Sequence, residues 1–105
     1  MMTFALSGFL ALSAGLLAIG IFGILTRRNF ILLLIAIEIG MNAAILNFVY
    51  FAAFAGASTG LTGQSIAVVL VGFAATEVAV GLAIVLALNR LKGTINVAEA
   101  TDLKL

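Results

Sequence analysis

The sequence predicts an all-α integral membrane protein with three transmembrane helices. Hydrophobic residues make up 65% of the 105 residues and charged residues only 9%, whereas a soluble domain of this size needs far more polar surface to cover its core. The apolar residues also fall into three runs, each longer than the ~20 residues that a helix needs to cross the hydrocarbon core. We therefore expect residues 1–105 to form a single membrane domain.

Polar interruptions divide the chain into its expected elements. The expected helices cover about residues 2–25, 30–55 and 66–88. The interruptions are TRRN at 26–29 and GASTGLTGQ at 56–64, and a mostly polar tail follows at 91–105. A strand interpretation fails because the runs are too long and show no alternation of apolar and polar residues. The tail is expected to dock on a neighbouring protein or to fray.

The basic residues indicate the orientation in the membrane. With three spans, the turn at 26–29 and the C-terminal tail lie on the same side. All five basic residues fall on that side, namely Arg27, Arg28, Arg90, Lys92 and Lys104. Because positive charge marks the cytoplasmic side, we expect the N-terminus outside and the C-terminus inside.

Several classes of function are excluded by composition. The chain has no cysteine and no histidine, so the usual ligands of zinc, haem and iron–sulfur clusters are missing. We therefore expect no metal site and no redox cofactor in this chain. The formal net charge is +1 and the longest basic run is Arg27-Arg28, which gives no signal for nucleic-acid binding.

Two carboxylates interrupt the apolar runs. Glu38 lies inside the second run and Glu77 inside the third, whereas Glu99 and Asp102 lie in the tail. A charge such as Asp at the centre of a membrane helix costs about 2.5–3.5 kcal/mol by insertion scales. Low dielectric disfavours the charged form of a carboxyl group, so such a group can exchange protons near neutrality. Glu38 and Glu77 are therefore candidate proton-relay residues.

The expected depths of the two carboxylates match. Glu38 is ten residues from Arg28, or about 15 Å along a helix, and Glu77 is thirteen residues from Arg90, or about 20 Å. Both therefore lie near the middle of the membrane. If the second and third helices pack side by side, the two carboxyl groups face a common polar track.

Two further residues are expected to support this site. Asn42 lies four residues after Glu38, on the same helix face, and is placed to hydrogen-bond it. Gly81 lies four residues after Glu77 and leaves room for a partner side chain or water. Asn47 is half a turn away from Glu38 around the helix and is expected to serve another contact.

A structural role for the glutamates is the main alternative, in which each is protonated and only joins helices by hydrogen bonds. The matched depth favours proton handling instead. No Lys or Arg lies inside any span, so a cationic partner would have to come from another subunit. Three helices also cannot enclose a water path alone, which indicates one part of a larger membrane assembly.

Two segments carry a family resemblance: GILTRRNFILLLIAIEIGMNAAILNF at 23–48 and AATEVAVGLAIVLALNR at 74–90. Together they resemble the K-type (NuoK-like, NADH dehydrogenase subunit 4L) membrane subunit of respiratory complex I and NDH-type complexes. The resemblance covers nearly the whole chain. The RRN turn combined with both glutamate-containing cores is specific, whereas either half alone is weak.

The resemblance implies a function and a location. It implies a non-redox subunit of a proton-pumping NADH:quinone oxidoreductase-type complex. The implied location is an energy-transducing membrane, namely a bacterial or archaeal plasma membrane, a thylakoid or the inner mitochondrial membrane. Glu38 and Glu77 match the family's membrane-embedded glutamates, which couple quinone reduction to proton translocation. Arg27 and Arg28 match its cytoplasmic-side basic pair. Thr76 departs from the alanine frequent in the family, and its hydroxyl is expected to bond back to its own helix.

The resemblance also implies partners. These are the J-type, A-type and H-type membrane-arm subunits and the N-type antiporter-like subunit, together with the lipid bilayer. Flavin, iron–sulfur clusters and quinone are expected in other subunits. Relatives take electrons from NADH, reduced ferredoxin or a reduced deazaflavin, so the electron donor stays open.

Other membrane classes remain as alternatives. A small multidrug transporter has a similar length and a membrane glutamate, but that class has four spans and is richer in Trp and Pro, both absent here. A rotary ATPase ring subunit usually has two helices and one carboxylate. A subunit of a multi-subunit cation/proton antiporter is closer, although it is not expected to carry both glutamate motifs. A purely structural membrane adaptor would tolerate Glu→Gln at both positions.

Overall fold

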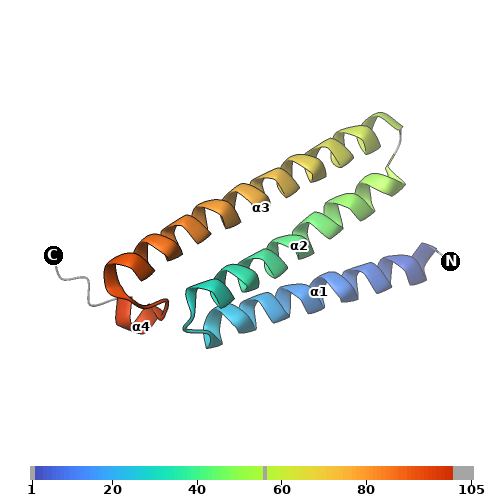
Figure 1. The fold of residues 1–105 in the computed structure, drawn as a ribbon. Coiled ribbons are helices and arrows are strands. Elements are labelled where there is room, and N and C mark those ends of the chain that lie inside the picture. The colour runs from blue at the N-terminus through green and yellow to red at the C-terminus, as the bar shows by residue number, and fades with distance from the viewer. Residues whose placement is uncertain (1, 56, 101–105) are drawn as a thin grey trace.

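Three long helices lie side by side in one layer. The computed structural model describes residues 2–55 and 57–100. Their elements are α1 (Met2–Thr26), α2 (Phe30–Phe54), α3 (Ala57–Lys92) and a short α4 (Val97–Ala100). Helix α2 lies between α1 and α3, and successive helices run in opposite directions (Figure 1).

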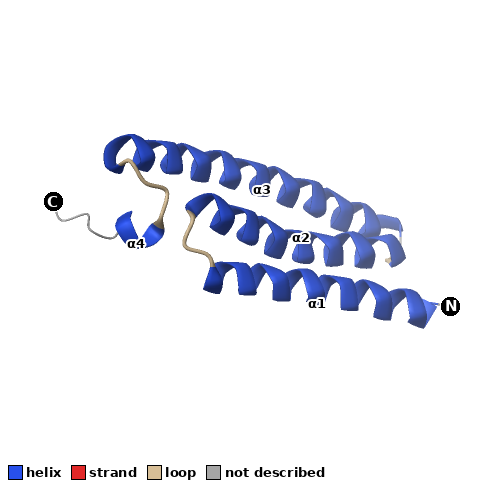
Figure 2. Cartoon of the chain, turned by 60° about the horizontal axis from the view of Figure 1, so that its bottom comes forward, coloured by secondary structure: helices blue, strands red, loops and turns tan. Residues whose placement is uncertain are grey.

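A second view, turned by 60°, keeps α2 in the middle of the layer (Figure 2). The Cα atoms extend over 55 × 24 × 16 Å, and α2 contacts both α1 and α3. Three of the described helices are long and apolar enough to cross a membrane. The predicted all-α fold class with three spanning helices is therefore confirmed.

Close packing of α1 on α2 depends on residues without large side chains. A Cβ atom added to Gly20 of α1 would lie 2.9 Å from the carbonyl oxygen of Ala36 and 2.9 Å from the backbone nitrogen of Gly40, both in α2. A Cβ at Gly23 would lie 2.6 Å from the Cβ of Ala36. In a membrane, where lipid is as apolar as leucine, such close backbone approach is a main source of helix association.

Helix α3 begins earlier than the sequence predicts. Residues 57–64 were expected in a loop, but they form the first turns of α3, which continues to Lys92. The reason is a packing contact with α2, which hydropathy does not predict. A Cβ at Gly60 would lie 2.8 Å from the carbonyl oxygen of Ala52, and one at Gly63 would lie 2.7 Å from the Cβ of Ala52. These glycines let α3 start directly against the last turns of α2, and this packing overrides their low helix propensity.

Helix α3 is longer than the membrane core is thick. Its 36 residues correspond to about 54 Å, against a hydrocarbon thickness of about 30 Å. Helix α3 must therefore tilt or project beyond the core. Gly93, with φ of +67°, follows its last residue and ends the helix in the left-handed conformation that glycine adopts most readily.

The first part of the tail docks on the chain itself. The backbone N–H of Phe30 donates to the carbonyl oxygen of Ile95 at 2.9 Å, and the N–H of Val97 donates to the carbonyl oxygen of Arg28 at 2.6 Å. Residues 93–100 therefore do not fray, as one of the two expectations had it, but are held by the chain itself. These bonds form because the turn after α1 and the end of α3 lie at the same end of the bundle (Figure 1). Asp102 and Lys104 lie outside the described residues.

Candidate functional site

Glu38 and Glu77 line one groove between α2 and α3, which we call the carboxylate groove. Its volume is about 190 Å³, and its other walls are apolar, including Leu34, Ile37 and Ile84. Glu38 is half-buried, whereas the side chain of Glu77 is exposed at the surface of this chain. The groove thus brings the two membrane carboxylates together in otherwise apolar surroundings.

A contact between Leu34 and Gly81 sets the register that places the two carboxylates opposite each other. A Cβ at Gly81 would collide with the end of the Leu34 side chain, so any larger residue there would require that side chain to shift. Glu38 lies one turn after Leu34 on α2, and Glu77 lies one turn before Gly81 on α3. Because the two helices run in opposite directions, both steps lead the same way along the bundle (Figure 1).

Gly81 was expected to leave room for a partner side chain or water beside Glu77. In the structure the side chain of Leu34 from α2 occupies this room, and Gly81 and Leu34 together form part of the groove wall. The glycine acts by closing the distance between two helices.

Neither carboxyl group has an internal partner. Within residues 2–55 and 57–100, no hydrogen bond or ion pair involves the side chain of Glu38 or Glu77. Asn42 is exposed and makes no hydrogen bond to Glu38, so the expected pair is absent from the described part of the chain. The hydroxyl of Thr76 donates to the carbonyl oxygen of Phe73 at 2.8 Å, as expected for a bond to its own helix.

Four of the basic residues gather at one end of the bundle. Arg27 and Arg28 follow the end of α1, and Arg90 and Lys92 lie in the last turn of α3. The α3 charges lie where a helix dipole favours cations. Asn29, next to the arginine pair, caps α2 by accepting hydrogen bonds from the backbone N–H groups of the second and third residues after it.

A buried polar contact between α1 and α2 was only partly foreseen. The hydroxyl of Ser13 donates to the carbonyl oxygen of Ala43 at 3.1 Å, and the amide nitrogen of Asn47 donates to the Ser13 oxygen at 2.8 Å. The expectation that Asn47 serves a contact other than Glu38 is confirmed. Ser13 was missed because a lone serine in an apolar run gives no signal until the rotation of α1 against α2 is known.

No arrangement for binding a metal is found among the described residues, where no three Asp or Glu side chains cluster. The described chain presents two carboxyl groups in one groove, four basic residues at one end of the bundle, and apolar surfaces elsewhere.

Comparison with known proteins identifies the family. Residues 8–105 match the family described as NADH-ubiquinone/plastoquinone oxidoreductase chain 4L. The chain belongs to this family. It is similar to NADH-quinone oxidoreductase subunit K of Brevibacillus brevis, with 42% identity over 98% of this chain and 99% of that protein. Subunit K of Bacillus anthracis is 46% identical over 93% of each chain, and that of Geobacillus kaustophilus 44% over 94% of this chain and 97% of the relative.

Membership of the chain 4L family confirms the resemblance found from the sequence. The match covers both the carboxylate groove and the arginine pair. The named relatives are all subunits of NADH-quinone oxidoreductase, not small multidrug transporters or antiporter subunits. The aligned region also spans 99% of the length of the Brevibacillus brevis relative.

Proposed function

We propose that this chain is a membrane subunit of a proton-pumping NADH:quinone oxidoreductase-type complex, in which Glu38 and Glu77 couple quinone reduction to proton translocation. The observation that carries the coupling role is that both carboxylates line one groove with no other ionisable side chain in its walls. Full-length similarity to subunit K proteins supports the place in the complex.

In this proposal the two carboxyl groups that line the groove act on each other electrostatically, because charges are poorly screened in apolar surroundings. Such a pair passes a charge change from one helix to the next without a redox centre in the chain.

A neighbouring subunit completes the site in this proposal. Glu77 is exposed on this chain, and an exposed carboxylate inside the membrane would face hydrocarbon at a cost of several kcal/mol. A polar or basic side chain from an adjacent J-type, A-type, H-type or N-type subunit would remove this cost. The same contact would join the pair to proton-exchanging groups elsewhere in the complex.

The chain itself carries no redox chemistry in this account. Without cysteine or histidine, it lacks the ligands of iron–sulfur and haem centres, so flavin, clusters and quinone belong to other subunits. The basic end of the bundle faces the cytoplasm or its equivalent, and the N-terminus faces the opposite side. The complex lies in an energy-transducing membrane.

The coupling role is tested by single substitutions in the assembled complex. Glu38→Gln and Glu77→Gln keep the side-chain shape but remove the exchangeable proton, so both should lower proton pumping while assembly persists. Glu99→Gln removes a carboxylate outside the spanning segments and serves as the matched control. Quinone reduction and acidification of vesicles are measured on the same preparation. Normal assembly with undiminished pumping in both variants would overturn the role, and loss of assembly would favour the helix-joining interpretation.

A further inference from the structure

A second groove lies between α1 and α2 at the basic end of the bundle, and we call it the arginine groove. Its volume is about 310 Å³, and its lining includes Arg27, Leu32, Ile35 and Ile39. We propose that the arginine groove binds an acyl chain of an anionic phospholipid, with the Arg27 guanidinium on the lipid phosphate. This site is separate from the carboxylate groove, because neither Glu38 nor Glu77 lines it.

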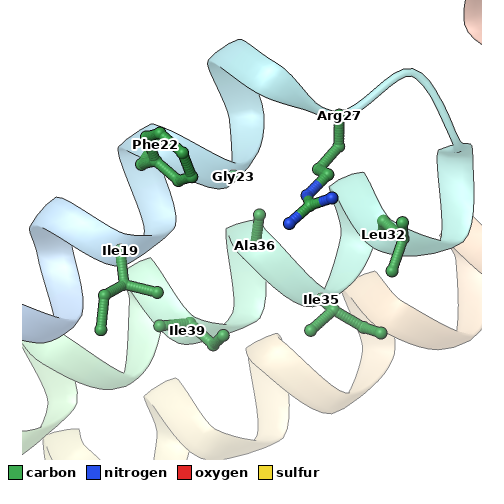
Figure 3. Close-up of a pocket in the computed structure, with 8 residues that line it drawn as sticks. All are labelled: Ile19, Phe22, Gly23, Arg27, Leu32, Ile35, Ala36 and Ile39. Carbon is green, nitrogen blue, oxygen red and sulfur yellow. The ribbon is translucent and has the colours of Figure 1, made fainter.

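The shape of the groove follows from small residues at its floor. Gly23 and Ala36 meet there so closely that a Cβ on the glycine would lie 2.6 Å from the alanine Cβ. Because neither has a side chain long enough to fill the space above the contact, a channel remains between larger neighbours. Ile19 and Phe22 of α1 form one wall, and the α2 side chains form the other (Figure 3).

The channel runs into the depth of the membrane. From Arg27 to Ile19 it follows eight residues of α1, or about 12 Å. Apart from Arg27, every side chain in its lining is apolar. These walls suit a hydrocarbon chain and offer no hydrogen bond to a polar ligand along this length.

Arg27 lies over the open end of this apolar channel. Its side chain extends from the end of α1 toward Ala36 and Leu32 (Figure 3). Within the described residues the guanidinium makes no hydrogen bond or ion pair, although it carries five N–H donors. A phosphate accepts two such donors in parallel, which makes it a strong partner for arginine.

Arg27 lies at the depth in the membrane at which lipid headgroups are found. Arg27 directly follows Thr26, the last residue of α1, so its guanidinium lies where the apolar span ends. A cation at this level with a hydrocarbon channel beneath it is complementary to an anionic amphiphile. A soluble anion would leave the channel empty. A carboxylate on a partner helix would also pair with Arg27. However, a helix is about 10–12 Å wide, which is too wide to enter a channel between two rows of side chains. The anionic phospholipid satisfies both parts of the site at once.

Photo-crosslinking in the intact complex tests the proposal. The purified complex is reconstituted with a trace of phosphatidylglycerol that carries a diazirine in its acyl chain, and labelled peptides are mapped after irradiation. Phosphatidylcholine with the same acyl diazirine is the zwitterionic control. We expect about fivefold more labelling of residues 19–39 by the anionic probe, which corresponds to the effect of one basic residue near an anionic headgroup.

Three variants separate a specific site from general lipid contact. Arg27→Gln should remove the preference for the anionic probe, whereas Arg90→Gln, with the same charge change at the same end of the bundle, should retain it. Leu32→Trp should fill the channel near its mouth and lower labelling by phosphatidylglycerol even though Arg27 is intact.

Three results would overturn the proposal. The first is equal labelling by the two probes in the unchanged complex. The second is an anionic preference that survives both Arg27→Gln and Leu32→Trp. The third is an unlabelled groove whose residues cross-link to a neighbouring subunit instead, which would identify a protein occupant.

Discussion

Replacing Gly20 by alanine tests the close packing of α1 on α2. The new Cβ would lie 2.9 Å from two backbone atoms of α2 and 3.0 Å from a third, the Cα of Gly40, whereas ordinary contact begins at 3.4 Å. Backbone atoms cannot rotate away as a side chain can. The two helices must therefore separate by about 0.5 Å at this level. Overpacking of this kind costs about 1–3 kcal/mol.

Gly15→Ala is the matched control for this prediction. It makes the same change on the same helix, but nothing lies within 4 Å of the Cβ position at Gly15. Its effect on stability within this chain should stay within about 0.5 kcal/mol. The readout is the temperature at which the subunit dissociates from the purified complex. A fall for Gly20→Ala only is expected. Equal behaviour of the two variants would refute the packing argument.

Three further substitutions test other contacts. Ser13→Ala removes the two hydrogen bonds that Ser13 makes to α2 and leaves the Asn47 amide nitrogen without this acceptor. This should cost about 0.6–1.7 kcal/mol, measured as a lower dissociation temperature that Ser13→Thr partly restores. Asn29→Ala removes the cap of α2 and should lower stability by about 1 kcal/mol, whereas Asn29→Asp retains the acceptor and most of the stability. Gly81→Val should force Leu34 away from α3 at a cost of about 1–3 kcal/mol and widen the carboxylate groove, so protons pumped per quinone should fall even in complexes that assemble. An unchanged proton ratio in assembled Gly81→Val complex would contradict the register argument.

Hydropathy predicted the first two helices closely but not the start of the third. The second span, expected over residues 30–55, is Phe30–Phe54 in the structure, because a polar turn and a cap delimit it. The third was expected from residue 66 and begins at Ala57. Gly60 and Gly63 are poor helix formers by themselves, and their packing on Ala52 is a long-range contact that local composition does not reveal.

The geometry of the carboxylate groove was partly within reach of the sequence. Counting residues from the basic end placed Glu38 and Glu77 at similar depth, and the structure brings them to one groove. The same count does not predict how each helix is rotated about its own axis, and therefore which side chains face the neighbouring helix. For this reason the bond from Ser13 of α1 to Ala43 of α2 was unforeseen. The expected bond from Asn42 to Glu38 lies within one helix, and it does not form in the described part of the chain.

The contacts of the tail could not be predicted from the sequence either. Its polar composition indicated a segment outside the membrane. The backbone bonds from Phe30 to Ile95 and from Val97 to Arg28 depend on the two chain segments meeting at one end of the bundle. Composition alone gives no information about such a pairing, because backbone groups form it and side chains contribute little.

We propose that Glu38 and Glu77 exchange protons as a pair. The most direct test is the number of protons pumped per quinone reduced in vesicles that contain the Glu38→Gln and Glu77→Gln double variant of the assembled complex. We expect this number to fall to background while the content of every subunit stays unchanged. An assembled double variant that pumps as many protons per quinone as the unchanged complex would contradict it.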